Sequence, residues 1–386
     1  MCIRDKLYLD GPYGRRPGKN SSSLSQSDGY TVSLLTIDEY LRQPVAERLP
    51  YYQREGRLYH VMMSQQFPRP LMEEIFGVAN TLKAMSHDYE GLEFLSRLLR
   101  HKRAMLYFTQ PSTRTFLSFL TACQLVGITT GEVQDPALSS EYKGESQEDA
   151  IRVFSSYFDL VIMRDPKPGF CEYIAYRQDR TGFSVPILNG GSGKDQHPTQ
   201  ALLDLYTMHR SFQRMGGISG KRYAFVGDLQ RGRAVRSVMY LLANYEDLDF
   251  YAIAPKGFQI SPDLQLHLGE RGVRLHFTDQ LNEVLPEVDC IYMTRVQDEY
   301  DLSGESGKID LANFSLTEEN VNLLPKHAII LHPLPRRQEI SSGIDANPRA
   351  MYWSQLRNGV YIRAALLLYI FGKNEQLPII QEKSRS

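Results

Sequence analysis

The chain has 386 residues, of which 42% are hydrophobic and 23% are charged, a composition and length that suit a globular protein of about two domains. Its formal net charge of -1 excludes a global basic field of the kind that attracts nucleic acid or an anionic membrane. Its four cysteines form no CxxC pair and no Cys/His set with zinc spacing, which argues against a metal module; Cys123 and Cys290 lie in apolar segments and favour buried thiols in a reducing, cytoplasmic setting.

The first 57 residues are predicted to be an N-terminal extension that is partly disordered. Residues 11–30 are rich in Gly, Ser and other polar residues and have no apolar periodicity. The segment TIDEYLRQ predicts a short helix with Thr36 as its N-cap. No apolar run near the N-terminus resembles a signal peptide, and the run Ala364–Phe371 is too short for a membrane span.

From Leu58 the pattern becomes that of a globular domain in which helices and strands alternate. The predicted elements are a helix over 71–85, a strand over 104–108, a helix from Ser112 with Leu117, Leu120 and Leu125 on its apolar face, a helix over 148–158, and strands over 160–163 and 185–188. Strands that alternate with helices predict parallel βαβ units.

The second half repeats this alternation. The predicted elements are strands over 222–229, 249–255, 290–294 and 328–335, a helix over 233–245, and a last helix over 359–371. We therefore predict two doubly wound α/β domains with parallel sheets, over 58–197 and 198–350, joined near 197–203. Residues 351–386 are predicted to carry a C-terminal helix that packs back on the first domain.

Polar residues follow the strand over 104–108, at the edge of the sheet where ligands of open α/β folds bind. Ser112, Thr113, Arg114 and Thr115 fall in the first turn of a helix, which offers free N–H groups and the positive end of the helix dipole. Three hydroxyl groups and a guanidinium add further donors, so the segment predicts a phosphate cradle. A simple N-cap beside a solvated Arg is an equally good interpretation of this segment alone.

Further polar residues follow other strands. Arg164 ends one strand, and His197 opens a helix with Gln200 one turn later. A histidine at a helix N-terminus favours its neutral form, and it can then donate to a developing oxyanion. Taken singly, a surface Arg and a helix-capping His are the more ordinary interpretations of Arg164 and His197.

The second half adds cationic groups but no dinucleotide motif. Only Gly227 and Gly232 of a GxGxxG pattern are present. The remaining candidates are Arg233 near a helix start, Arg295 and Gln297 after a strand, the carbonyls of Pro333 and Leu334, and Lys143, which is otherwise a solvated lysine in a polar loop. Several cations and one histidine, with no nucleophile and base pair, suit an anionic substrate held for direct attack by a second substrate.

A set of motifs also resembles a known family. PSTRT, KGES, MRDP, HPTQALLD, GDLQRGR, MTRVQ and HPLPR occur in this order, over about Leu58–Lys373. The set is similar to the aspartate carbamoyltransferases of the aspartate/ornithine carbamoyltransferase superfamily. PSTRT and HPxQ are shared with the ornithine enzymes, whereas HPLPR and MTRVQ are the aspartate-type versions.

The resemblance implies a homotrimer of two-domain subunits with shared active sites and no metal or organic cofactor. It implies that the amine of L-aspartate attacks carbamoyl phosphate, giving N-carbamoyl-L-aspartate and phosphate on the way to pyrimidines. It assigns phosphate binding to Ser112, Thr113, Arg114 and Thr115, carbonyl polarisation to Arg164, His197 and Thr115, and the carbamoyl amine to Gln200 with the carbonyls of Pro333 and Leu334. It assigns the aspartate carboxylates to Arg233, Arg295 and Gln297, and implies that Lys143 and Ser139 arrive from the neighbouring subunit.

Four positions depart from the family pattern. Gln110 replaces the usual Glu, Phe116 and Leu120 replace an Arg and a Glu at i,i+4, and Tyr300 replaces an Arg. The resemblance implies that the missing Glu and Arg bridge the two domains on closure. Because the Glu and the Arg are both absent, neither charge is left without its partner. We therefore hypothesise that domain closure is stabilised differently, or less, in this chain.

Two alternatives remain at this point. One is a catalytically silent homologue that serves as a scaffold, and the other is a carbamoyltransferase for a related amino acid such as succinylornithine. The sequence leaves open whether regulatory or dihydroorotase-like subunits bind, whether nucleotides inhibit, and what residues 1–57 do.

Overall fold

The computed structural model describes residues 34–134, 144–182, 184–193, 196–295 and 311–378. The polar segment 11–30, for which the sequence predicts disorder, lies outside these residues. Within them, the chain forms two parallel α/β lobes, so the predicted fold class is confirmed.

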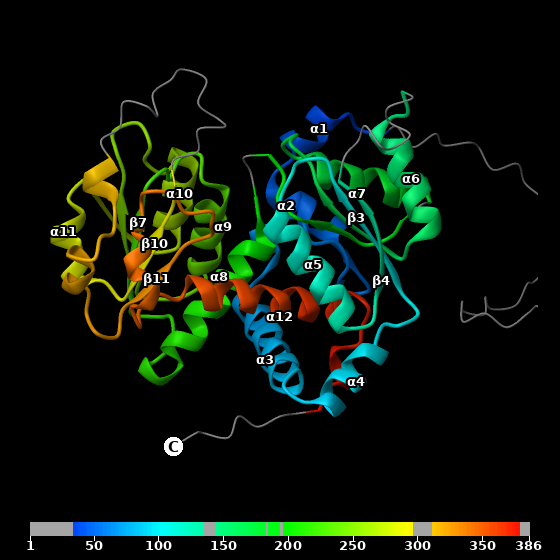
Figure 1. The fold of residues 1–386 in the computed structure, drawn as a ribbon. Coiled ribbons are helices and arrows are strands. Elements are labelled where there is room, and N and C mark those ends of the chain that lie inside the picture. The colour runs from blue at the N-terminus through cyan, green and yellow to red at the C-terminus, as the bar shows by residue number, and fades with distance from the viewer. Residues whose placement is uncertain (1–33, 135–143, 183, 194–195, 296–310, 379–386) are drawn as a thin grey trace, which may run out of the picture. The chain divides into compact units, whose positions relative to one another are not determined.

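The first lobe is built on a four-stranded parallel sheet (Figure 1). Its strand order is β4 (Thr129–Val133), β3 (Arg103–Phe108), β5 (Leu160–Arg164) and β6 (Ile187–Asn189). The two central strands are almost entirely buried, as expected for a sheet with helices on both faces. The helices of this lobe are α3 (Arg69–Met85), α4 (Tyr89–Arg97), α5 (Thr113–Leu125), α6 (Gln147–Tyr157) and α7 (Phe170–Thr181).

The second lobe has a five-stranded parallel sheet (Figure 1). Its strand order is β11 (Ile329–Leu331), β10 (Cys290–Met293), β7 (Arg222–Val226), β8 (Asp249–Ile253) and β9 (Arg274–Thr278). The order runs outward in both directions from β7, which places β7 and β10 side by side at the centre. The helices α9 (Arg233–Leu242), α10 (Pro262–Glu270) and α11 (Leu281–Val284) belong to this lobe.

Two long helices join the lobes. Helix α8 (Pro198–Phe212) packs against α9, and α12 (Tyr352–Ile370) packs against α8, α3 and α5. Arg363 of α12 donates to the Ser118 hydroxyl of α5 across 2.7 Å. The C-terminal helix therefore returns to the first lobe, as predicted, although it begins seven residues before the predicted start at 359.

Of the three residues predicted for the apolar face of α5, Leu120 and Leu125 pack against the core, and the prediction for Leu117 was wrong. Leu117 of α5 is 50% exposed, and the buried side of the helix carries Phe116, Phe119 and Cys123 instead. Phe116 lies edge-on against Phe108 of β3, with ring centroids 5.3 Å apart. The position where the family carries an Arg is therefore part of the apolar core here. The helices and strands that the sequence did not predict are β4, β9, α4, α7, α10 and α11, together with α2 (Val45–Arg48) and the antiparallel pair β1 (Gln53–Arg54) and β2 (Arg57–Leu58).

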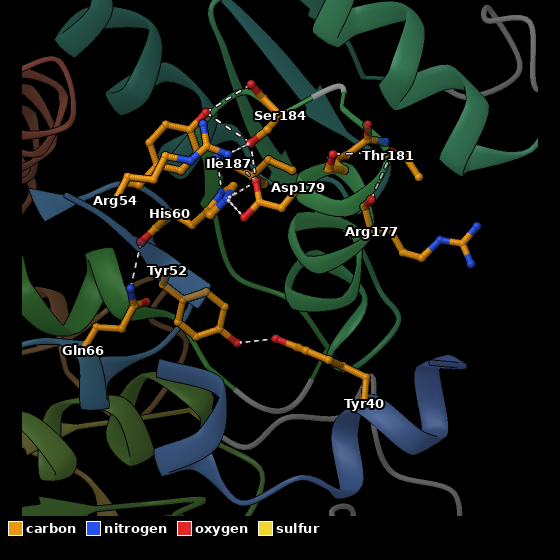
Figure 2. A network of polar contacts seen from close by, with 12 residues as sticks. Tyr40, Tyr52, Arg54, His60, Gln66, Arg177, Asp179, Thr181, Ser184 and Ile187 are labelled. Carbon is orange, nitrogen blue, oxygen red and sulfur yellow. Dashed lines mark hydrogen bonds and ion pairs between the residues drawn. The ribbon is translucent and has the colours of Figure 1, made fainter. Parts of the chain in front are cut away.

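The residues from Leu35 to His60 pack against α7 (Figure 2). The predicted helix is α1 (Ile37–Arg42), and Thr36 forms a capping box with Glu39. The buried hydroxyls of Tyr40 and Tyr52 lie 2.8 Å apart, and Tyr52 also donates to Glu172 of α7 across 2.9 Å. This part of the N-terminal extension is therefore an ordered layer of the first lobe.

A second contact of this segment reaches β6. The Ile187 N–H donates to Nδ1 of His60 across 3.0 Å, which makes Nδ1 the acceptor. The opposite nitrogen, Nε2, then carries the proton and donates to Asp179 at 3.3 Å (Figure 2). Since β6 leads directly into the 189–193 loop, His60 ties the N-terminal segment to the strand before that loop.

Candidate active site

A cavity of about 340 Å³ opens where the carboxyl ends of both sheets face each other. The predicted residues that line it are Ser112, Arg114, Thr115, Arg164, His197, Gln200, Arg233, Arg295, Pro333 and Leu334. Residues 130 or more positions apart in the sequence thus meet in one site. Thr113 is exposed and does not line the cavity.

The first turn of α5 forms one wall of the cavity. Ser112 is the N-cap residue, with an extended backbone that lets the chain turn from β3 into the helix. Thr115 is buried, whereas Arg114 projects further into the opening. Partial burial, together with the nearby charge of Arg295, lowers the pKa of Arg114, so the two guanidinium groups repel each other where no anion separates them. Such a pair favours an anionic ligand.

Arg164 and His197 meet around a glycine. The Arg164 guanidinium donates to the Gly190 carbonyl across 3.2 Å. Gly191 has φ +103°, and a Cβ there would come within 3.0 Å of both the Arg164 guanidinium and the His197 ring. A glycine is therefore required at this position by backbone conformation and by space.

His197 is neutral in this site. Its pKa lies well below the usual value because the ring is buried and because Arg233, Arg164 and Arg363 surround it. The Thr115 hydroxyl lies 3.4 Å from its Nε2, and its Nδ1 is buried without a hydrogen-bond partner among the described residues. The neutral form agrees with the sequence prediction, but burial and neighbouring cations are the main causes.

The second lobe contributes the opposite wall. Arg233, the first residue of α9, donates to the Gln110 side-chain carbonyl at 3.1 Å and to the Gly193 carbonyl at 2.6 Å. Arg295 follows β10 and lies close enough to Arg114 to affect its pKa. Arg233 therefore reaches the cavity from the start of a helix of the second lobe, and Arg295 reaches it from the end of a strand.

A short loop after β11 presents the carbonyls of Pro333 and Leu334. The Leu334 N–H donates to Nδ1 of buried His332 across 2.7 Å, so Nε2 of His332 donates to Glu339 at 2.8 Å. Leu334 adopts φ +54°, a conformation that costs about 1–3 kcal/mol in a residue other than glycine. The His332 and Glu339 contacts hold this strained loop in place.

Among the polar residues at or near the cavity that have no sequence prediction are Arg363 and Asp204. Arg363 lines the cavity from α12; burial lowers its pKa to about 10, which leaves it charged at neutral pH. Asp204 is fully buried on α8, one turn after Gln200, and accepts a hydrogen bond from it. The signal for Arg363 is the single charge within the apolar run YIRAALLLYI, since a buried charge in a helix needs a partner or a ligand.

Four residues with predictions lie outside the described residues, namely Ser139, Lys143, Gln297 and Tyr300. In the part of the chain that the structure describes, no group of three His, Cys, Asp or Glu side chains is arranged to hold a metal ion. Within the same ranges, every helix is too short or too polar to cross a membrane. Cys123, Cys171 and Cys290 are buried free thiols, as the sequence predicts for Cys123 and Cys290.

Comparison with known proteins places this architecture in a family. The carbamoyl-P binding domain of aspartate/ornithine carbamoyltransferase matches residues 59–210, and the Asp/Orn binding domain matches residues 219–370. The chain belongs to the aspartate/ornithine carbamoyltransferase family. The first matched residue, 59, follows most of the ordered N-terminal segment, so that segment lies outside the shared domain.

Similar proteins in this family carry the name aspartate carbamoyltransferase. The chain is 38% identical to the chloroplastic aspartate carbamoyltransferase of Oryza sativa, over 81% of this chain and 84% of that protein. It is 36% identical to the aspartate carbamoyltransferase catalytic subunit of Vibrio cholerae, over 82% of this chain and 97% of that protein.

Solved structures agree with this grouping. The catalytic subunit of M. jannaschii aspartate transcarbamoylase is 33% identical, with a TM-score of 0.72 over 82% of this chain and 99% of that one. The Trypanosoma cruzi enzyme in complex with carbamoyl phosphate and aspartate is 32% identical, with a TM-score of 0.70 over 81% of this chain and 95% of that one.

Proposed function

We propose that this chain transfers the carbamoyl group of carbamoyl phosphate to the amine of L-aspartate, giving N-carbamoyl-L-aspartate and phosphate. The chain is a carbamoyltransferase, and its relatives from rice and Vibrio cholerae are named aspartate carbamoyltransferases. The observation that carries the proposal is the cavity itself. It brings a helix start with hydroxyls and Arg114, a neutral His197, and the cations Arg233 and Arg295 to one place.

The first wall suits carbamoyl phosphate. Ser112, Thr115 and Arg114, with the N–H groups of the first turn of α5, bind the phosphate, and Thr113 contributes through its backbone. Arg164, His197 and Thr115 polarise the carbonyl oxygen and stabilise the oxyanion that forms on attack. The free Nδ1 of His197 gives the imidazole a donor position that a ligand in the cavity would use. Gln200 and the carbonyls of Pro333 and Leu334 hold the carbamoyl amine.

The second wall suits a dicarboxylate. Arg233 and Arg295, together with Gln297, bind the two carboxylates of aspartate and direct its uncharged amine at the carbonyl carbon. The new C–N bond forms first and gives the tetrahedral oxyanion, and the C–O bond to phosphate breaks when this oxyanion collapses. No Asp or Glu is among the described residues that line the cavity, so the departing phosphate takes the amine proton. Charge stabilisation and positioning supply the rate.

The test is the release of phosphate from carbamoyl phosphate that depends on aspartate. We expect formation of N-carbamoyl-L-aspartate in equal amount, and loss of both with His197→Ala. A folded protein without this activity would favour the silent scaffold. Faster reaction with another amino acid, such as succinylornithine, in a competition assay would favour a different acceptor substrate.

Assembly and location are parts of the same proposal. We propose a homotrimer in which Lys143 and Ser139 of one subunit complete the site of its neighbour, in the cytoplasm and with no metal or organic cofactor. One relative, the multifunctional protein CAD of Squalus acanthias, is matched over only 13% of its length, which is consistent with a fused or associated partner in some relatives. Light scattering of the purified protein tests the trimer, and cell fractionation tests the location.

A further inference from the structure

Asp204 lies behind the cavity and directly contacts Gln200, one of the groups that are proposed to hold the carbamoyl amine. Its Oδ1 accepts from Gln200 Nε2 across 2.8 Å and also from Gln355 Nε2 of α12. Its Oδ2 accepts from the hydroxyl of Tyr292 on β10 across 2.6 Å. Asp204 is completely buried, so these three donors take the place of water around it.

The direction of each hydrogen bond follows from a backbone group. The His332 N–H can only donate, and it donates to Gln355 Oε1 across 3.1 Å. The other end of that amide, Gln355 Nε2, must therefore face Asp204 and donate to Oδ1. Because Oδ1 is then an acceptor, the group of Gln200 that faces it must be the NH2 group. The carbonyl oxygen of Gln200 is left on the opposite side of the amide.

We propose that Asp204 is a positioning residue that fixes the Gln200 amide, so that its carbonyl oxygen accepts from the carbamoyl NH2 and selects against a donor substrate that lacks this group. This inference rests on the proposed function and deepens it. The same carboxylate also connects through Gln355 to the N–H of His332, which begins the loop carrying Pro333 and Leu334. One buried side chain thus contacts Gln200 directly and is connected through Gln355 to the start of the Pro333–Leu334 loop.

This arrangement does not depend on the charge of Asp204. Burial raises the pKa of Asp204 to about 6, against the hydrogen bonds from Tyr292, Gln355 and Gln200 and the charge of Arg363. If Asp204 binds a proton on Oδ2, the Tyr292 hydroxyl can rotate to accept it, while Oδ1 still accepts from both amides. Asn in place of Asp preserves the same pattern, with its NH2 toward Tyr292. The position requires an acceptor at Oδ1 rather than a negative charge.

The test uses two stable probes that differ at one group. Phosphonoacetamide carries the NH2 of the carbamoyl group, and phosphonoacetone carries a methyl in its place. Calorimetry gives the ratio of their dissociation constants, in which effects common to both phosphonates cancel. We expect the wild-type protein to prefer the amide by about tenfold or more, because a polar group built to bind NH2 is left unpaired by a methyl.

A set of variants separates positioning from a general structural role. Asp204→Leu should reduce the preference to that of Gln200→Leu, and combining the two changes should reduce it no further. Asp204→Asn should retain the wild-type preference to within about threefold. If Asp204→Leu does not fold, Asp204→Ser replaces it, because a short hydroxyl that both donates and accepts leaves the amide unfixed. Thr207→Val is the matched control, since it removes the next buried bond between α8 and α12, from Asn358 at 3.0 Å.

The outcomes are distinct. A preference unchanged in Asp204→Leu, or a loss in Asp204→Asn equal to that in Asp204→Leu, would overturn the role of Asp204. A similar loss in Thr207→Val would also overturn it. If the wild type shows no carbamoyl transfer but prefers the amide probe through Asp204, the proposed function fails and the positioning role stands. Failure of the wild type to bind either probe would overturn both.

Discussion

The Arg233 guanidinium donates to the Gln110 side-chain carbonyl across 3.1 Å, and this bond joins the start of α9 to the residue two positions before the Ser112–Thr115 turn. It connects the proposed aspartate side of the cavity to the proposed phosphate side. The resemblance described above implies a Glu at this position, whereas here a neutral amide accepts from Arg233.

Gln110→Glu should therefore weaken aspartate binding. A carboxylate beside Arg233 forms a charge-assisted bond and competes with the substrate carboxylate, so we expect the KM for aspartate to rise roughly tenfold. Adding Tyr300→Arg should reverse part of this rise, by giving the new carboxylate a second cation. Gln124→Glu, at an exposed position of α5, is the control. Unchanged KM and kcat in both the single and the double variant would remove the support for altered domain closure.

Arg114→Ala should lower kcat by about 10²–10³, as loss of one electrostatic donor at a reacting centre does elsewhere. The reason is that Arg114 is the only side-chain cation in the first turn of α5, where the phosphate is proposed to bind. Steady-state phosphate release measures the effect. Arg152→Ala, on the surface of α6, should leave kcat unchanged. A loss below tenfold for Arg114→Ala would contradict its role.

The His197 imidazole should stay neutral through the pH range in which a free histidine titrates. Burial and three nearby guanidinium groups depress its pKa in the folded protein, so a proton binds the unfolded chain more readily. Stability from this group is present above pH 6.5 and is lost as pH falls toward the lower folded pKa. NMR of the ring protons, assigned by difference with His197→Gln, should show no titration between pH 8 and 6. A midpoint near 6.5 would be inconsistent with this site.

Arg48→Met should destabilise the protein by about 3–5 kcal/mol, because it removes the cation that pairs with the buried carboxylate of Glu172, to which Tyr52 still donates. Arg48 pairs with Glu172, and their side chains are only 11% and 7% exposed. Chemical denaturation measures the change. Arg97→Met breaks the exposed Arg97–Glu93 pair on α4 and should cost no more than about 1 kcal/mol. Equal effects of the two variants would show that the N-terminal segment adds little to the first lobe.

Mixed trimers test whether sites are shared between subunits. Lys143→Ala and His197→Ala should each be inactive alone. After random mixing, a cyclic trimer containing both kinds of subunit has one intact site, so we expect recovery of about a quarter of wild-type activity. Arg164→Ala mixed with His197→Ala is the control, because those two side chains lie in one subunit around Gly191. Recovery in the control, or none in the test pair, would argue against shared sites.

The strands and helices around the cavity were predictable because their patterns are local. Buried runs such as 104–108 and 160–163 have few alternatives to a central parallel strand, and they became β3 and β5. Leu117 was wrongly placed on the buried face of α5 because it has the hydrophobicity of a core residue, and only the tertiary packing of Phe116 and Phe119 decides which side is buried. Half-exposed strands such as β9 gave no apolar signal.

The cavity residues after strands were predictable from their position at the carboxyl ends of a parallel sheet. Arg363 and Asp204 were not, because their partners lie 245 and 151 positions away in Ser118 and Gln355. A charged residue within an apolar helix signals a buried partner without indicating which one. The contact between Gln110 and Arg233 could not be predicted for the same reason, since 123 positions separate the two residues.

Helix α12 also determines when, during synthesis of the chain, the cavity can be completed. It follows every other element around the cavity in the sequence, yet it supplies Arg363 to the lining and Gln355 to the Asp204 cluster. During synthesis the first lobe can collapse around its own sheet long before this helix emerges. The groove on α3, α5 and α8 then stays open, and the pocket stays incomplete. The cavity is therefore completed only after residues 352–370 have emerged, so a chain stopped before them on the ribosome would lack Arg363 and Gln355.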